Sequence, residues 1–220
     1  GLHWAYDAAN HSLTITNPTP DSPQPMPDLT FSTKQPWKKY RGGIQTVTIG
    51  AGVNHVGAYA FTNCAKLATV TLPAGLKEIE KNAFGGCEKL TSINLPEGLK
   101  TIGEGAFNAC FALSDLTIPK SVETIEGGVF YQCEKLASIT IPNGVTAIAD
   151  DVFAGCKALT TVTLPAGLQT IGKNAFQDCA ALASISIPKS VTAIGSEAFS
   201  KCTALKDVTV AWETPISTYA

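Results

Sequence analysis

The seven cysteines of this 220-residue chain are the residues whose type and spacing first suggest chemistry. They lie 23 residues apart without a break, at Cys64, Cys87, Cys110, Cys133, Cys156, Cys179 and Cys202. Cysteine thiolates are nucleophiles and metal ligands, and paired cysteines form disulfides. Disulfide frameworks and zinc sites use paired cysteines or Cys-x-x-Cys spacing, whereas here an odd number of cysteines occupies one slot of a repeat. The spacing therefore indicates the architecture of the chain before it indicates chemistry.

Each cysteine follows a phenylalanine by three residues, so a whole 23-residue unit recurs. A fixed period of this length is typical of a solenoid, in which each coil buries its apolar face only by stacking on its neighbours. Free cysteine is a small hydrophobe that suits an inward slot. Coils about 4.8 Å apart would bring neighbouring cysteines within bridging range, but parallel Cα–Cβ bonds disfavour the disulfide torsion. We therefore expect reduced, buried thiols, with disulfides as the alternative.

The unit at residues 67–89 predicts the path of one coil. Leu67, Val70 and Leu72 have the spacing of a short strand with its apolar side inward. The Pro-Ala-Gly that follows fits a type I turn. Ser121 and Ser190 replace the glycine of this turn in two coils, which argues against an obligatory positive φ at that slot.

The second half of the unit predicts two further inward-facing segments. Residues 76–79 carry apolar side chains three apart and are expected to be extended, while residues 83–87 are expected to form a helical or 3₁₀ turn on the opposite wall. The recurring phenylalanines predict a spine of aromatic rings through the stack. We expect Phe130 in mid-array to matter more for stability than Phe61 near the N-terminal end.

These residues resemble leucine-rich repeats, and most closely the BspA-like class with the pattern L-x-x-I-x-I-P-x-x-V-x-x-I-G-x-x-A-F-x-x-C. The resemblance covers about three quarters of the chain. It implies a right-handed leucine-rich-repeat solenoid of the α/β class, mostly β with short helical turns. The recurring slots of the sequence predict seven full coils and the first strand of an eighth. It also implies an exported bacterial surface protein, often host-associated, that adheres to host extracellular proteins or to other cells, without catalysis and without a cofactor.

The register divides the chain into three parts. Residues 44–210 form the repeat array, and residues 1–43 are expected to be a β-rich cap in which a hairpin around the turn-prone AANHS, then Trp37 and Tyr40, cover the first coil. The cap includes a proline-rich loop, for which a recognition motif is the alternative. Residues 211–220 are expected to be a partial C-terminal cap, with Trp212 folding over, or a point of truncation. We favour truncation.

Composition excludes several classes of partner. The formal net charge is -2, with 16 basic and 18 acidic residues mixed along the chain, so no basic stripe for nucleic acid is present. No run approaches the roughly 20 apolar residues of a membrane span, and no signal peptide is recognisable at the N-terminus. If the protein is exported, its signal has been removed.

Few residues outside the cysteine slot suggest catalysis or metal binding. His55 and Cys64 could form a base and a nucleophile, but the cysteine lies in an inward slot and the histidine in an outward one. Asp150 and Asp151 are adjacent carboxylates without further regularly spaced ligands, so a solvated turn is favoured over calcium. We expect no catalytic residue, no cofactor site and no metal site.

The outward positions of the predicted strands are the candidate binding face. Thirteen of their sixteen residues carry hydroxyl groups. The ten central positions are Thr69, Thr71, Ser92, Asn94, Asp115, Thr117, Ser138, Thr140, Thr161 and Thr163. In leucine-rich repeats this row faces the ligand, although threonine is also simply a good strand former. Phe111 and Tyr131 form a second candidate, an outward aromatic pair on adjacent coils, with an incidental surface pair as the alternative.

The sequence thus favours a non-catalytic, secreted or cell-surface binding protein whose partner is a host extracellular-matrix or cell-surface protein. A glycan-binding module of the cell envelope and a structural spacer are the alternatives. A glycan binder should show clustered exposed aromatic residues, and the sheet face has none.

Overall fold

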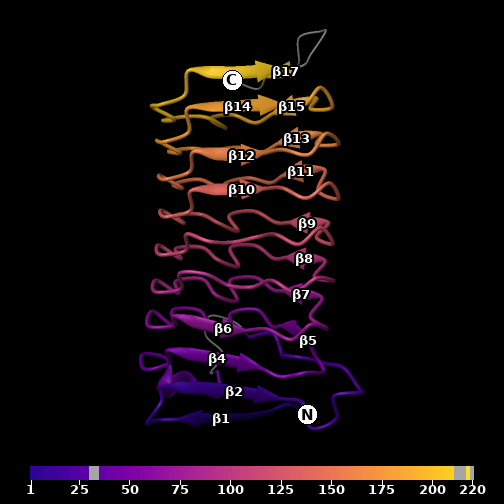
Figure 1. Cartoon of the computed structure of the whole chain (residues 1–220), viewed down its shortest axis with the longest axis vertical. Helices are drawn as coiled ribbons and strands as arrows, with labels where there is room; N and C mark the ends of the chain where they lie inside the picture. The colour runs from indigo at the N-terminus through magenta and orange to yellow at the C-terminus, as the bar shows by residue number, and fades with distance from the viewer. Residues whose placement is uncertain (30–34, 211–216, 219–220) are drawn as a thin grey trace.

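The computed structural model describes residues 1–29 and 35–210 and the backbone of residues 217–218. Its coils stack in one column, with the N-terminal hairpin at one end and the last coil at the other (Figure 1). Two walls of the column contain the strands. The first wall comprises β1 (His3–Asp7), β2 (Ser12–Thr16), β4 (Thr46–Ile49), β6 (Thr69–Thr71), β10 (Ser138–Thr140), β12 (Thr161–Thr163), β14 (Ser184–Ile187) and β16 (Asp207–Val210).

The second wall has shorter strands. It comprises β3 (Gln24–Pro25), β5 (Val53–Val56), β7 (Glu78–Ile79), β8 (Thr101–Ile102), β9 (Thr124–Ile125), β11 (Ala147–Ile148), β13 (Thr170–Ile171), β15 (Ala193–Ile194) and β17 (Ser217–Thr218). Within the array the paired strands are parallel, and equivalent residues of successive coils lie side by side, as with Ser138 beside Thr161 and Ile79 beside Ile102. The solenoid predicted from the 23-residue period is therefore confirmed.

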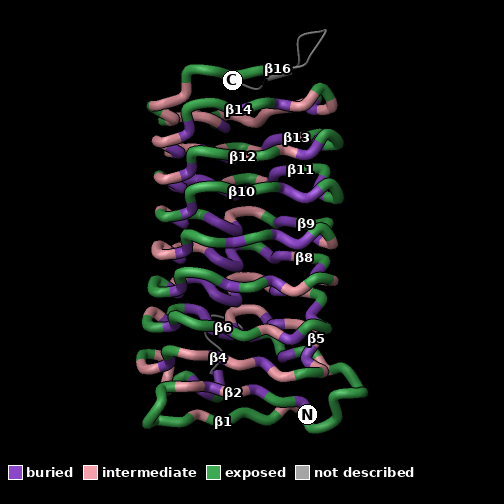
Figure 2. Tube along the Cα trace, in the orientation of Figure 1, coloured by how far each residue is buried: buried purple, intermediate pink, exposed green. Residues whose placement is uncertain are grey.

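A column of stacked phenylalanine rings fills the interior. From Phe61 to Phe176 each ring of the column is fully buried. Neighbouring ring centroids lie between 5.3 Å and 5.9 Å apart and the rings are nearly parallel. Buried and exposed stretches alternate along each coil (Figure 2). Because each ring is covered by the coils on both sides, stability depends on contacts between coils.

The wall that carries the phenylalanines contains no continuous helix in the described residues. It is a run of turns, several of them closed by single bonds of the 3₁₀ type, such as Cys87 N to Phe84 O at 3.1 Å. The helical alternative of the prediction is therefore wrong, and isolated 3₁₀-type turns are present. The 3₁₀ helix η1 (Lys38–Tyr40) precedes the array. Each coil instead places two residues four apart in the left-handed region, such as Asn82 with φ of 51° and Gly86 with φ of 73°. A left-handed residue interrupts a right-handed helix. The amide of Phe84 then donates to the carbonyl of Ala106 in the next coil at 2.9 Å, which adds a third set of bonds between coils.

The cysteines line the same wall as free thiols, as predicted. Six of the seven are buried and Cys202 is partly exposed. Each thiol from Cys87 onward donates to the carbonyl of the phenylalanine in the preceding coil, as Cys156 Sγ does to Phe130 O at 3.2 Å. The thiol slot thus supplies both a small apolar group and a weak donor.

The N-terminal hairpin is also confirmed. Strand β1 pairs antiparallel with β2, and β2 pairs parallel with β4, so the hairpin extends the first wall. Trp37 stacks on Phe61 with centroids 5.7 Å apart, and its indole Nε1 donates to Ala60 O at 3.0 Å. Tyr40 also packs against the core, and its ring stacks on that of Tyr6 at 4.2 Å. The boundary at residue 43 stays a prediction, and Trp212 lies outside the described residues.

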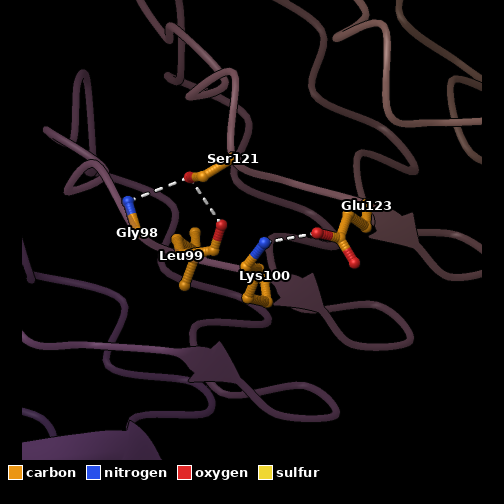
Figure 3. A network of polar contacts seen from close by, with 5 residues as sticks. All are labelled: Gly98, Leu99, Lys100, Ser121 and Glu123. Atoms are coloured by element: carbon orange, nitrogen blue, oxygen red, sulfur yellow. Dashed lines mark hydrogen bonds and ion pairs between the residues drawn. The ribbon is translucent and has the colours of Figure 1, made fainter.

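The serine that replaces a turn glycine in one coil has a role of its own. Ser121 Oγ accepts a hydrogen bond from Gly98 N at 2.9 Å and donates one to Leu99 O at 2.8 Å in the same preceding coil (Figure 3). Beside it, Lys100 pairs with Glu123. The glycine slot tolerates serine because the side chain satisfies backbone groups of the neighbouring coil.

Some glycines that follow the isoleucine of the second wall are required by close packing of the backbone. A Cβ on Gly172 would lie 2.6 Å from the carbonyl carbon of Ala149, whereas a Cβ on Gly167 would meet no atom within 4 Å. We expect Gly172→Ala to cost about 1–3 kcal/mol of unfolding free energy through overpacking. The matched variant Gly167→Ala should change it by less than about 1 kcal/mol. Urea denaturation of both variants checks this, and equal midpoints would contradict it.

Candidate binding surfaces

The predicted binding face is present on the first wall. Its ten side chains are all exposed, while the residues between them point into the core. This alternation follows from the period of two along a strand. Ser138 lies beside Thr161 and Thr140 beside Thr163, so hydroxyl groups of neighbouring coils form two rows. The structure therefore brings these side chains together on one surface, and their role in binding stays a prediction.

The middle of this face is less regular than its ends. Between β6 and β10 the described residues of the first wall make a single isolated bridge, Ser92 to Asp115. Asn94 and Asp115 replace strand-favouring residues in these two coils, and both residue types are depleted in strands. A cleft of about 460 Å³ opens there, and its lining includes Asp115, Thr117, Ser138 and Thr140. The cleft on this face therefore lies beside the carboxylate of Asp115, between hydroxyl-bearing side chains.

A larger hollow lies between β9 of the second wall and the turns that carry the phenylalanines. Gly127 and Gly128 occupy slots that Glu104 and Gly105 fill in the coil before and that two aspartates fill in the coil after. Because this coil lacks both side chains, a cavity of about 830 Å³ opens beside it. Gly128 has φ of 62°, a left-handed conformation that glycine adopts without strain. We call this cavity the Gly127 hollow.

Four carboxylates line the Gly127 hollow, namely those of Glu104, Glu126, Asp150 and Asp151. Three are oriented by bonds to their neighbours: Glu126 Oε2 accepts from Glu104 N at 2.9 Å, Asp150 Oδ1 from Lys173 N at 2.7 Å, and Asp151 Oδ1 from Asn174 Nδ2 at 3.1 Å. The fourth, Glu104, pairs with Lys81 Nζ at 2.6 Å. The hollow is therefore an acidic surface with fixed side chains.

The predicted aromatic pair is only partly placed at this hollow. Tyr131 is 37% exposed and lines the hollow. Phe111 is half-buried and does not contribute to the lining. The sequence did not indicate that Tyr131 would lie beside Asp150 and Asp151. The two adjacent glycines, Gly127 and Gly128, could have indicated a hollow beside Tyr131. A contact between Phe111 and Tyr131 stays a prediction.

The geometry does not assemble a nucleophile from Cys64 and His55. Cys64 is fully buried, and burial raises the pKa of its thiol to about 12. At neutral pH this thiol is protonated, whereas a nucleophilic cysteine needs the thiolate. His55 Nε2 instead lies 3.5 Å from Glu78 Oε2.

His55 belongs to a cluster on the second wall that the sequence analysis missed. Strand register places His55 beside Glu78, and Glu80 follows two residues later. One ligand atom from each of the three side chains lies within 4.8 Å of the other two. Burial, a hydrogen bond with Glu78 and the negative charges of Asp28, Glu78 and Glu126 raise the pKa of Glu80 to about 7. The 23-residue offset from His55 to Glu78 could have revealed this neighbourhood.

Comparison with known proteins gives matches to one family and to several solved structures. The family described as the BspA type leucine rich repeat region matches residues 39–153 and 123–220, with 6 copies. No curated protein matches the chain. Among the described residues, no helix is long and apolar enough to cross a bilayer.

Three crystal structures of bacterial leucine-rich repeat proteins are similar to this chain. The T. pallidum protein aligns with a TM-score of 0.64 and 29% identity, over 82% of this chain and 87% of that one. A leucine rich cell surface protein of Faecalibacterium prausnitzii aligns with a TM-score of 0.59 and 32% identity, over 96% of this chain but only 53% of that one. The Eubacterium ventriosum protein aligns with a TM-score of 0.57 and 24% identity, over 96% and 70%, and supports the fold alone.

Proposed function

Because the chain belongs to the BspA-type leucine-rich repeat family of bacterial surface proteins, we propose that it is a non-catalytic binding protein of a bacterial cell surface. Its partner is a host extracellular-matrix protein or a protein on another cell. The similar Faecalibacterium prausnitzii chain is a cell surface protein, which supports this location. This chain spans about half of that protein, so activities of a longer protein stay outside the proposal.

The observation that carries the proposal is the exposed face of the first wall. All ten predicted side chains are exposed there in register, and the cleft at Asp115 and Thr117 breaks the flat surface. Short hydroxyl side chains donate and accept hydrogen bonds with little steric bulk. A partner could therefore approach the backbone of several coils at once, and the cleft gives room for one of its side chains. We place the centre of the interface at this cleft.

A glycan partner is the second candidate, and the Gly127 hollow favours it. Tyr131 offers an exposed ring for stacking against a sugar, and the carboxylates of Asp150 and Asp151 offer hydrogen-bond acceptors beside it. Concave sites with a few convergent polar groups are typical of small-ligand binding. The two candidates use different walls, so variants can separate them.

We expect the double variant Thr117→Lys and Thr140→Lys to weaken binding to a matrix protein at least tenfold, about 1.4 kcal/mol. Two long charged side chains would block the cleft of the first wall without entering the core, because both positions are exposed. The measurement is biolayer interferometry against immobilised, purified extracellular-matrix proteins, with a glycan array in parallel.

Two control variants test whether a loss of binding is specific to the cleft of the first wall. Thr146→Lys adds a lysine at an exposed position outside the first wall and should leave the affinity unchanged. Tyr131→Ala removes the ring at the Gly127 hollow and should also leave protein binding unchanged. Loss of glycan binding in Tyr131→Ala would favour the second candidate. Absence of saturable binding to every matrix protein and glycan would contradict both and leave the spacer role.

A further inference from the structure

We propose that His55, Glu78 and Glu80 form a binding site for a divalent transition-metal ion on the second wall. Parallel pairing of β5 with β7 puts His55 directly beside Glu78. Glu80 directly follows the end of β7, and its carboxylate lies within 4.8 Å of ligand atoms of both His55 and Glu78. Two coils thus contribute a mixed set of one imidazole and two carboxylates.

The distances suit an ion after a small side-chain adjustment. The three ligand atoms lie within 4.8 Å of one another, and His55 Nε2 is already 3.5 Å from Glu78 Oε2. Ligand atoms at about 2.0–2.2 Å from a tetrahedral ion are about 3.4 Å apart. The His55 and Glu78 side chains are 32% and 37% exposed, so they can rotate and an ion can reach them. Three protein ligands would leave a fourth position for water.

The surrounding charge also favours a cation. The carboxylate of Glu80 experiences the negative charges of Glu78, Asp28 and Glu126. The adjacent lysine, Lys81, pairs with Glu104 at 2.6 Å and does not neutralise them. A divalent ion would satisfy two carboxylates that the fold holds close together, and the imidazole would complete the set.

The donor set selects the class of ion. Imidazole with carboxylates suits Zn²⁺ and its first-row neighbours, whereas Ca²⁺ and Mg²⁺ prefer oxygen ligands alone. The buried cysteines do not compete in the folded chain, because burial raises their pKa values and keeps the thiols protonated. We therefore take Zn²⁺ as the probe.

The site occurs once in the array. The slots of Glu78 and Glu80 hold Thr101 and Gly103 in the next coil and Thr124 and Glu126 in the one after. Neither coil provides an imidazole there. A bound ion would join the first coil to the second, close to the N-terminal hairpin. Because it would bind only the folded arrangement, it would stabilise that end of the column by mass action.

Isothermal titration of the chelator-treated chain with ZnCl₂ tests the proposal. We expect one equivalent of saturable binding and a rise in Tm with Zn²⁺ concentration. His55→Ala and Glu80→Gln should each weaken the affinity at least tenfold and abolish the rise in Tm. Calcium at the same concentration should produce neither effect.

Matched variants distinguish this site from adventitious binding. His11→Ala removes a histidine that lies on the N-terminal hairpin next to β2 and should leave the Zn²⁺ affinity unchanged. Circular dichroism without metal establishes whether each variant folds as the unaltered chain does. Unchanged Zn²⁺ affinity in a folded His55→Ala variant would overturn the proposal, as would failure of the unaltered chain to bind one equivalent.

Discussion

Phe130→Ala is expected to lower the unfolding free energy by about 3–5 kcal/mol, the usual cost of deleting a buried aromatic ring. Phe130 is fully buried. Its ring centroid lies 5.9 Å from that of Phe107 and 5.5 Å from that of Phe153, so both faces lose contact when it is removed. Relaxation is limited because backbone bonds fix the spacing of the coils on either side. Urea denaturation followed by circular dichroism measures the loss.

Phe199→Ala is the matched control at the C-terminal end of the spine. Its ring stacks on Phe176 at 5.4 Å, but the residue is only partly buried, so the loss should be clearly smaller. The sequence predicts a smaller loss of stability for substitution of Phe61 than of Phe130. The structure does not support this difference, because Phe61 is also fully buried and Trp37 stacks on its outer face. Equal, negligible losses for Phe130→Ala and Phe199→Ala would contradict the view that contacts between coils hold the chain together.

The repeat predicted most strands of the first wall, because each slot of the repeat faces either the core or the solvent. The coils that begin at Leu90 and Leu113 are the exceptions, since they form only the bridge from Ser92 to Asp115. Leu67 and Val70 recur with their equivalents in every coil. The equivalents of Val70 from Val47 to Ile185 lie in the core or pack against it, whereas Val208 in the last strand is 47% exposed because no described coil covers it.

Apolar spacing alone predicts a helical or 3₁₀ turn for residues 83–87. The spacing of Ala83, Phe84 and Cys87 fits a helix, but it also fits a chain of turns. In this chain the amide of Phe84 bonds to the next coil, while those of Ala83 and Cys87 bond within their own coil. The spacing of apolar residues does not indicate whether a backbone amide bonds within its own coil or to the next one.

The residue types at the left-handed positions explain why this wall is not helical. The slot of Asn82 holds Tyr59, Gly105, Gly128, Asp151, Asn174 and Glu197 in the other coils. Glycine, asparagine and aspartate adopt positive φ more readily than other residues. Their recurrence was therefore a readable signal of a non-helical wall, although tyrosine and glutamate in the same slot weaken it.

The candidate surfaces were predicted unevenly for a related reason. Exposure of the hydroxyl face follows from strand alternation alone. The Gly127 hollow depends on what is missing from one coil, and the cluster of His55, Glu78 and Glu80 depends on which slots of different coils coincide. Both need comparison across the 23-residue offset. A search for motifs along the chain does not make this comparison.

Titration with a thiol reagent is expected to find the thiols other than Cys202 unreactive in the folded chain and all seven reactive after denaturation without reductant. Burial raises the pKa of Cys156 to about 12, so only about one thiol in 10,000 is ionised at pH 8, against roughly one in four for an exposed cysteine. Steric cover by the neighbouring coils suppresses the reaction further, since the reagent must reach the sulfur.

Cys202 provides the internal control for this experiment. It is partly exposed at the C-terminal end of the thiol column, although its Sγ still donates to Phe176 O at 3.1 Å. It should therefore react first, and Cys202→Ser should remove that fast phase while six thiols still appear on denaturation. Recovery of a single thiol from the denatured chain would indicate three disulfides. That result would contradict parallel, unpaired thiols while leaving the 23-residue period in place, because stacking of the coils and oxidation of their sulfurs are separate properties.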